Sequence, residues 1–123
     1  MTPLETVRSF ISSIERGDLD AALALVGDNC EYDNVPMSKI IGRDAIRTAL
    51  GPFLSACSKV QWTITREAAT GGVVFNERVD RFVMPHGEVA IPVSGVWEVV
   101  DGKITLWRDY FDLATFQGQM PAA

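Results

Sequence analysis

The chain of 123 residues has few of the residues that several common kinds of protein chemistry require. It contains one histidine and two cysteines, and no histidine, cysteine or acidic residues cluster at the spacing of metal ligands. It has no run of lysine or arginine, and its formal net charge at pH 7 is −5. These absences argue against a metal centre or other cofactor, and against binding of nucleic acid or an anionic membrane surface.

Long hydrophobic runs are missing as well. No apolar stretch approaches the ~20 residues that a membrane span requires. Residues Met1 to Glu5 do not combine a basic region with an apolar stretch, as a secretory signal would. We therefore expect no membrane association and take the cytoplasm as the default compartment. In that compartment Cys30 and Cys57 are expected to be small apolar side chains without a chemical role.

The first half of the chain carries helix signals. Thr2 to Glu5 read as a capping box with a proline at the first helical position, followed by apolar residues at helical spacing as far as Ile14. Asp18 can cap a second short helix that ends near Gly27. A third helix is expected over 43–56, with a kink or early break at 51–52, where glycine precedes proline.

The second half alternates between β-rich segments and turn signals. With a short extended segment at 30–34, the predicted strands are 59–69, 73–84, 89–100 and 103–113. Residues 1–123 therefore form one α+β domain, in which the helices pack on one face of a curved, antiparallel or mixed sheet. Such a sheet can wrap into a half-open cone.

Asp109 is the residue that the predicted strands explain least. Read as a strand, residues 107–113 place it on the same face as Trp107, Phe111 and Leu113. An ionised carboxylate without a partner in a protein interior costs several kcal/mol. Asp109 must therefore have a partner, a proton or a function, and a purely structural ion pair is one open interpretation.

The strand 73–84 repeats this pattern. Its even positions place Arg78 and Asp80 between Val74, Phe82 and Met84. A second pair of polar residues, Tyr32 and Asn34, shares one face of the short segment 30–34, although Asn34 taken alone is better explained as a turn residue before Pro36.

Together these polar residues belong to motifs whose order and spacing extend over nearly the whole chain. The motifs are Tyr32-Asp33-Asn34-Val35-Pro36, Gly42-Arg43-Asp44-Ala45, Glu77-Arg78-Val79-Asp80, Gly102-Lys103-Ile104-Thr105 and Trp107-Arg108-Asp109-Tyr110-Phe111-Asp112. In this arrangement the sequence resembles the limonene-1,2-epoxide hydrolase family. The resemblance implies the cone-shaped fold of nuclear transport factor 2 and ketosteroid isomerase, and a homodimer.

The resemblance also implies a reaction and its residues. Asp109, Arg78 and Asp80 would form an Asp-Arg-Asp triad, in which Asp109 is the general base and Asp80 the general acid. Tyr32 and Asn34 would bind the attacking water, and the product of a small epoxide would be a vicinal diol. From the strand faces alone, the substrate would contact Val74, Phe82, Met84, Phe111 and Leu113, so it should be largely apolar.

Elementary chemistry agrees with a pair of carboxyl groups in different protonation states. Opening an epoxide with water requires one proton to be removed and another to be delivered. The covalent alternative of α/β-hydrolases needs a histidine base, whereas His86 lies in a predicted turn and the chain has no G-x-S-x-G motif. A ketosteroid-isomerase-like enzyme and a binding module without catalysis remain as alternatives.

Overall fold

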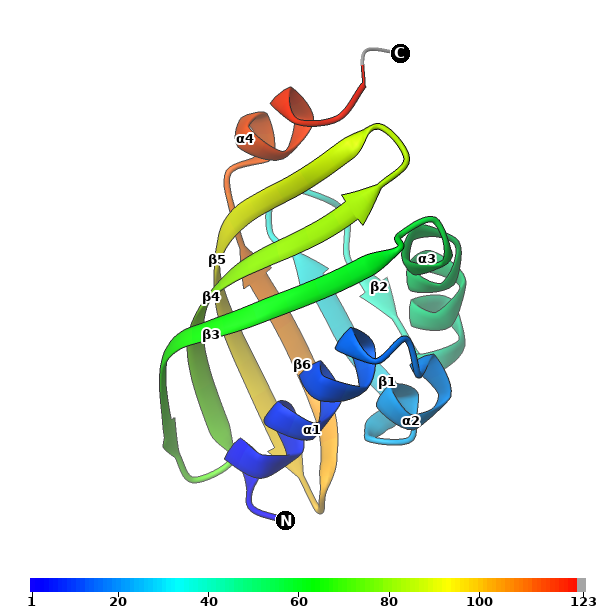
Figure 1. Cartoon of the computed structure of the whole chain (residues 1–123). Coiled ribbons are helices and arrows are strands. Elements are labelled where there is room, and N and C mark those ends of the chain that lie inside the picture. The colour runs from blue at the N-terminus through cyan, green and yellow to red at the C-terminus, as the bar shows by residue number, and fades with distance from the viewer. Residues whose placement is uncertain (122–123) are drawn as a thin grey trace.

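The computed structural model describes residues 1–121 as a curved mixed sheet with three helices against one of its faces and a fourth helix at one end (Figure 1). No helix among these residues is long and apolar enough to cross a membrane. The elements are α1 (Pro3–Glu15), α2 (Leu19–Leu23), β1 (Val26–Asn34), β2 (Ile40–Ile41), α3 (Arg43–Ser55), β3 (Lys59–Thr70), β4 (Val73–Met84), β5 (Gly87–Val100), β6 (Lys103–Tyr110) and α4 (Leu113–Gly118).

Helix α1 begins as the sequence predicts. The backbone N–H of Glu5 donates to Thr2 Oγ1 at 3.1 Å, and that of Thr2 donates to Glu5 Oε1 at 2.8 Å, which completes the capping box. The apolar side of the helix is buried against β3 to β6, and its core residues are Val7, Phe10, Ile11 and Ile14. This helix therefore closes one part of the concave face of the sheet.

Helix α2 is shorter than predicted. It ends at Leu23, and Val26 already begins β1, where it pairs with Ile104 of the parallel strand β6. The predicted extension of this helix towards Gly27 is wrong because strand pairing with a distant segment overrides the local helical spacing.

Helix α3 forms over nearly its whole predicted range of 43–56. It continues through Pro52 to Ser55, so the predicted early break is wrong. A proline in a helix interior costs about 3 kcal/mol. The final turn is held by packing of Phe53 and Leu54 against the core, and the Phe53 ring meets the Phe82 ring at 5.0 Å between centroids.

The sheet has the strand order β2-β1-β6-β5-β4-β3. Strands β3 to β6 form the predicted antiparallel meander, whereas β1 joins β6 in parallel and β2 adds an unpredicted edge strand. The strand predicted over 103–113 ends at Tyr110, because Asp112 caps α4 by accepting from the Thr115 N–H at 3.0 Å.

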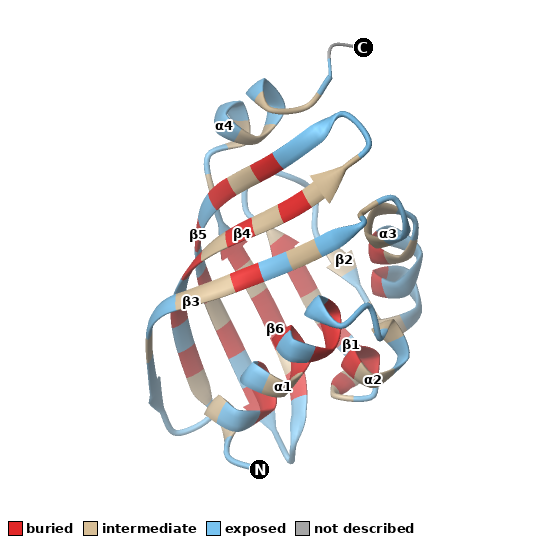
Figure 2. Cartoon of the chain, viewed as in Figure 1, coloured by how far each residue is buried: buried red, intermediate tan, exposed pale blue. Residues whose placement is uncertain are grey.

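Burial alternates along β4, so its two faces differ (Figure 2). The even-numbered residues from Val74 to Phe82 are buried on the concave side, in agreement with the prediction. The same side holds Trp97 of β5 and Trp107 of β6, whose rings stack at 5.3 Å. The polar residues of β4 and β6 therefore lie within the aromatic core rather than on the surface.

Candidate active site

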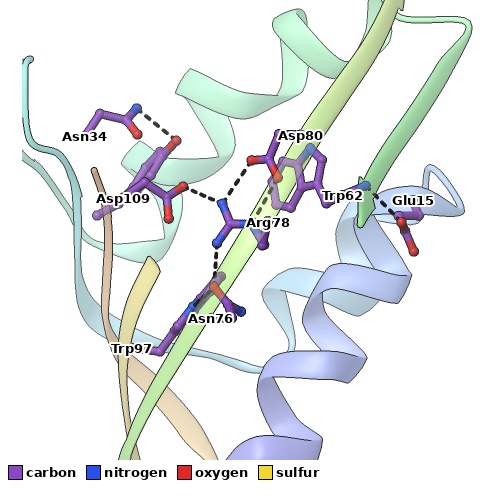
Figure 3. A network of polar contacts seen from close by, with 9 residues as sticks. Glu15, Asn34, Trp62, Asn76, Arg78, Asp80, Trp97 and Asp109 are labelled. Carbon is purple, nitrogen blue, oxygen red and sulfur yellow. Dashed lines mark hydrogen bonds and ion pairs between the residues drawn. The ribbon is translucent and has the colours of Figure 1, made fainter. Parts of the chain in front are cut away.

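Arg78 connects two buried carboxyl groups that come from different strands (Figure 3). Its Nε donates to Asp80 Oδ1 at 3.0 Å, and its Nη2 donates to Asp80 Oδ2 at 2.9 Å and to Asp109 Oδ2 at 3.0 Å. The three residues are between 1% and 5% exposed. The structure thus brings together Asp109, Arg78 and Asp80, as the family resemblance implies.

The strand between these residues makes the contact possible. Strand β5 separates β4 from β6, and Gly95 of β5 pairs with Asn76 on one side and with Asp109 on the other. A Cβ atom at Gly95 would lie 2.5 Å from Arg78 Nη1, which is closer than real Cβ contacts allow. The absence of a side chain at Gly95 therefore gives the guanidinium the space to cross β5.

The charges of the triad favour one proton between the two acids. Two ionised aspartates around one arginine would leave a net charge of −1 in the interior. Burial raises the pKa of Asp80, and the negative charge of Asp109 raises it further, while Arg78 opposes both effects. Burial alone would lower the pKa of Arg78, but the carboxylates of Asp109 and Asp80 raise it, so the guanidinium stays charged.

Tyr32 and Asn34 lie beside Asp109 because β1 pairs in parallel with β6. Asn34 pairs with Asp109 and Tyr32 with Trp107 in this register, and the Tyr32 and Trp107 rings stack at 3.9 Å. Asn34 Nδ2 donates to the Tyr32 hydroxyl at 3.0 Å. Burial and the charge of Asp109 raise the pKa of Tyr32, which keeps its hydroxyl proton available for donation.

Asp109 also has an acceptor that is not used. Its Oδ1 atom is buried and has no hydrogen-bond partner among the described residues, whereas Oδ2 is bound by Arg78. A buried carboxylate oxygen without a partner is unfavourable unless a ligand or water satisfies it. This atom, with the nearby hydroxyl and amide, can bind and polarise a water molecule.

A cavity of about 340 Å³ opens beside these groups. Its polar lining residues are Tyr32, Asn34, Asp80 and Asp109, while Arg78 lies behind the carboxyls and does not line it. The remaining wall is almost entirely apolar and comes from several elements of the fold. Examples are Leu50 and Phe53 of α3, Trp62 of β3 and Phe116 of α4.

Of the residues predicted to contact substrate, Phe82 and Phe111 line this cavity. Val74, Met84 and Leu113 are not part of its wall as the structure describes it. Val74 is fully buried in the core, Met84 lies at the end of β4, and Leu113 begins α4 because β6 has already ended. A shared strand face is therefore not enough to predict which residues line the cavity.

Other residues of the site were missed. The Arg78 guanidinium carbon lies 5.4 Å from the centroid of the Trp62 ring and 5.7 Å from that of Trp97, within the range of cation–π attraction. Asn76 Oδ1 accepts from Arg78 Nη1 at 2.9 Å. Two signals in the sequence could have found them: Asn76 is two positions from Arg78 on the same strand face, and a glycine inside a strand pattern, as at Gly95, indicates close approach.

Within residues 1–121, no three or more histidine, cysteine or acidic side chains are arranged to hold a metal ion. His86 lies in an exposed turn, as predicted, where its ring contacts the backbone carbonyl of Gln119.

Comparison with known proteins gives a consistent result. The family model for the limonene-1,2-epoxide hydrolase catalytic domain matches residues 1–121. The epoxide hydrolase EphG of Mycobacterium tuberculosis is 37% identical over 107 residues, which cover 87% of this chain and 71% of the relative.

Solved structures support the same relationship. An LEH-like epoxide hydrolase of M. tuberculosis superposes with a TM-score of 0.85 at 34% identity, covering 94% of this chain and 86% of that one. A putative SnoaL-like polyketide cyclase of Shewanella denitrificans has a TM-score of 0.87 over 95% of both chains, but at 16% identity it shows the fold alone. The predicted fold and the resemblance are confirmed, and the chain belongs to the limonene-1,2-epoxide hydrolase family, whose members are hydrolases.

Proposed function

We propose that the protein adds water to a small apolar epoxide in one step and releases a vicinal diol. The observation that carries the proposal is the guanidinium of Arg78 between two buried carboxyl groups, one of which has a raised pKa. General epoxide hydrolysis follows from the family; the one-step mechanism and its residues rest on this geometry.

Asp109 acts as the general base. Its Oδ1 removes a proton from a water molecule that Tyr32 and Asn34 also bind, and the water oxygen forms a bond to one epoxide carbon. The bond between that carbon and the epoxide oxygen breaks at the same time. Asp80, whose pKa is raised by burial, holds the one proton shared by the two acids and delivers it to the departing oxygen.

The exchange leaves the charge of the triad unchanged. Before the reaction Asp109 is ionised and Asp80 protonated, and after it the two states are reversed. Arg78 contacts both carboxyls and therefore stabilises the negative charge at either position. No net charge is created in the buried site during the reaction, which limits the cost of low-dielectric surroundings.

The cavity supports an apolar substrate. Its volume and its aromatic and aliphatic wall suit a compact hydrocarbon skeleton better than a charged one. An isomerase of the ketosteroid type would use one carboxylate in such a cavity. The presence of two carboxyl groups around one guanidinium favours hydrolysis, because one group can remove a proton while the other delivers one.

We also propose that two copies associate through the convex face of the sheet. This face exposes Phe75 of β4 and Tyr110 of β6, which are 47% and 46% exposed. Large aromatic residues on the free face of a sheet are typical of contact surfaces.

Diol formation from a panel of terpene, cycloalkene and steroid epoxides tests the reaction. Asp109→Asn and Asp80→Asn should each lower kcat by about a hundredfold or more, the scale of general acid–base catalysis. Asp20→Asn is the matched control, because its carboxyl is 84% exposed in a surface pair with Arg47. Diol formation at the wild-type rate by either triad variant would refute the mechanism.

A single turnover in heavy-oxygen water tests the one-step route. The label should enter the diol and not the protein, because water attacks carbon directly. Label in an aspartate carboxyl would show a covalent ester intermediate instead.

A further inference from the structure

The end of the Arg78 guanidinium that faces away from Asp80 is held by a second polar pair (Figure 3). Asn76 Oδ1 accepts from Arg78 Nη1 at 2.9 Å and from Trp97 Nε1 at 3.2 Å. Both partners are pure donors. The Asn76 amide must therefore direct its oxygen towards them, since the opposite orientation would set its NH₂ group against two other N–H groups.

This arrangement satisfies two buried donors and leaves one donor of Asn76 itself unpaired. Asn76 is 5% exposed and Trp97 is fully buried, and Asn76 Nδ2 has no hydrogen-bond partner among the described residues. A buried donor without a partner destabilises a protein, but an apolar side chain of similar volume would leave two buried donors, Arg78 Nη1 and Trp97 Nε1, without their acceptor. The amide at this position therefore serves Arg78 through its oxygen, although its own NH₂ group stays unpaired.

The contacts of Arg78 with its two acids are unequal. Asp80 receives two parallel hydrogen bonds, from Nε and Nη2, while Asp109 receives one, from the shared Nη2. A guanidinium released at its Nη1 end can keep both bonds to Asp80 while it turns. The single bond to Asp109 is then the first to lengthen.

We infer that Asn76, oriented by Trp97, is a positioning residue that fixes the Arg78 guanidinium so that it contacts the carboxylate of Asp109 as well as that of Asp80. The inference deepens the proposed function and rests on it for its effect on catalysis. Asn76 does not line the cavity, so it acts on turnover through Arg78 and not on substrate binding.

Loss of this contact has a defined effect on pH dependence. The groups that face Asp109 are Arg78 and Asp80 from β4 and Tyr32 from β1, and Glu15 at the end of α1 adds a negative charge that acts on Asp80. A hydrogen bond to a carboxylate favours its ionised form. If the bond from Arg78 lengthens, the base of the reaction should therefore take up its proton at a higher pH.

The primary variant is Asn76→Leu, which keeps the volume and removes the acceptor. We expect kcat to fall by about ten- to a hundredfold with KM within about twofold, as for a misplaced catalytic group. The acidic limb of the profile of kcat/KM against pH should move up by about one unit. Trp97→Phe keeps an aromatic ring but removes the donor that orients Asn76, and it should shift the limb in the same direction by less.

Val99→Ala is the control for destabilisation alone. Val99 is buried on β5, two positions from Trp97, and does not line the cavity. Its replacement should lower the urea midpoint and leave the acidic limb in place. The inference would be overturned if the acidic limb of the pH profile moved as far in Val99→Ala as in Asn76→Leu. It would also be overturned if the limb stayed in place in both Asn76→Leu and Trp97→Phe.

A carboxyl titration by ¹³C NMR tests the positioning role of Asn76 without depending on epoxide hydrolysis. In Asn76→Leu the Asp109 carboxyl should titrate at a higher pH than in the wild type, and in Val99→Ala it should not. If the wild type forms no diol, the proposed function fails, while this titration still decides whether Asn76 positions Arg78. An unchanged Asp109 titration in both Asn76→Leu and Trp97→Phe would overturn the inference whether or not the wild type hydrolyses epoxides.

Discussion

Gly95→Ala adds one methyl group at the point where Arg78 crosses β5. The new Cβ would lie 2.5 Å from Arg78 Nη1, 2.6 Å from Asn76 Oδ1 and 2.9 Å from Trp97 Nε1. All three atoms belong to buried side chains. No flexible, solvent-facing group is available to absorb the overlap.

The size of the effect follows from these distances. To restore a contact of 3.4 Å, the Arg78 nitrogen must retreat by about 0.9 Å. Such a shift exceeds what the 3.0 Å bond from Nη2 to Asp109 tolerates, because hydrogen bonds weaken steeply beyond about 3.2–3.5 Å. A misplacement near 1 Å lowers rates by about a hundredfold, and overpacking a core costs about 1–3 kcal/mol.

The assay compares kcat for diol formation with the free energy of unfolding in urea. Gly95→Ala should lower both, and the loss of kcat measured on folded protein should be near a hundredfold. Gly51→Ala of α3 is the control, because its Cβ would make an ordinary 3.8 Å contact with Leu19 and its backbone is helical. That replacement should keep kcat, although a Cβ directly before Pro52 disfavours the helical backbone and should lower the free energy of unfolding. Wild-type turnover and stability in Gly95→Ala would refute the account of how Arg78 reaches Asp109.

Three further predictions concern stability and binding. The folded protein raises the pKa of Asp80, so the contribution of Asp80 to the free energy of unfolding should be complete below about pH 4 and should decline as the pH rises through the raised pKa. Urea titrations at several pH values should show this decline. In Asp80→Asn the dependence on pH should be flatter. Gln119→Ala removes two side-chain hydrogen bonds, of 2.7 and 2.9 Å, that tie the end of α4 to Ala90. Because α4 forms part of the cavity wall, KM should rise with little change in kcat. Equal KM values in the variant and the wild type would show that α4 does not help to shape the cavity. Thr2→Ala removes the helix cap of α1 and should cost about 0.5–2 kcal/mol with unchanged kcat; a lowered kcat would contradict a purely structural role.

The predictable parts of the fold depend on local patterns. The capping box at Thr2 and the alternation along 73–84 each describe one segment and its faces, and both are confirmed. The parallel pairing of β1 with β6 and the short strand β2 depend on contacts between distant segments, which no local pattern encodes. The early end of β6 reflects a competition at Asp112, where helix capping prevails over strand propensity.

The candidate site also has features that a local pattern predicts and features that depend on contacts between distant segments. Asp109 is visible in the sequence because a carboxylate breaks an apolar strand face, and Arg78 with Asp80 repeats the pattern. The roles of Tyr32 and Asn34 required a family resemblance, since their distance from Asp109 depends on the register between β1 and β6. Similarly, the contact of Asn76 with Trp97 of β5 depends on register, whereas its contact with Arg78 follows from their spacing along β4.

The crossing of β5 by Arg78 links catalysis to the cooperativity of the sheet. The two acids lie on β4 and β6, and the arginine that joins them requires the intervening strand to be in register. Partial opening of the meander would break this ion pair while most of the secondary structure is still present. Activity should therefore disappear at or before the first loss of β-sheet signal in rising urea, so that partly unfolded molecules contribute no slow or unselective hydrolysis.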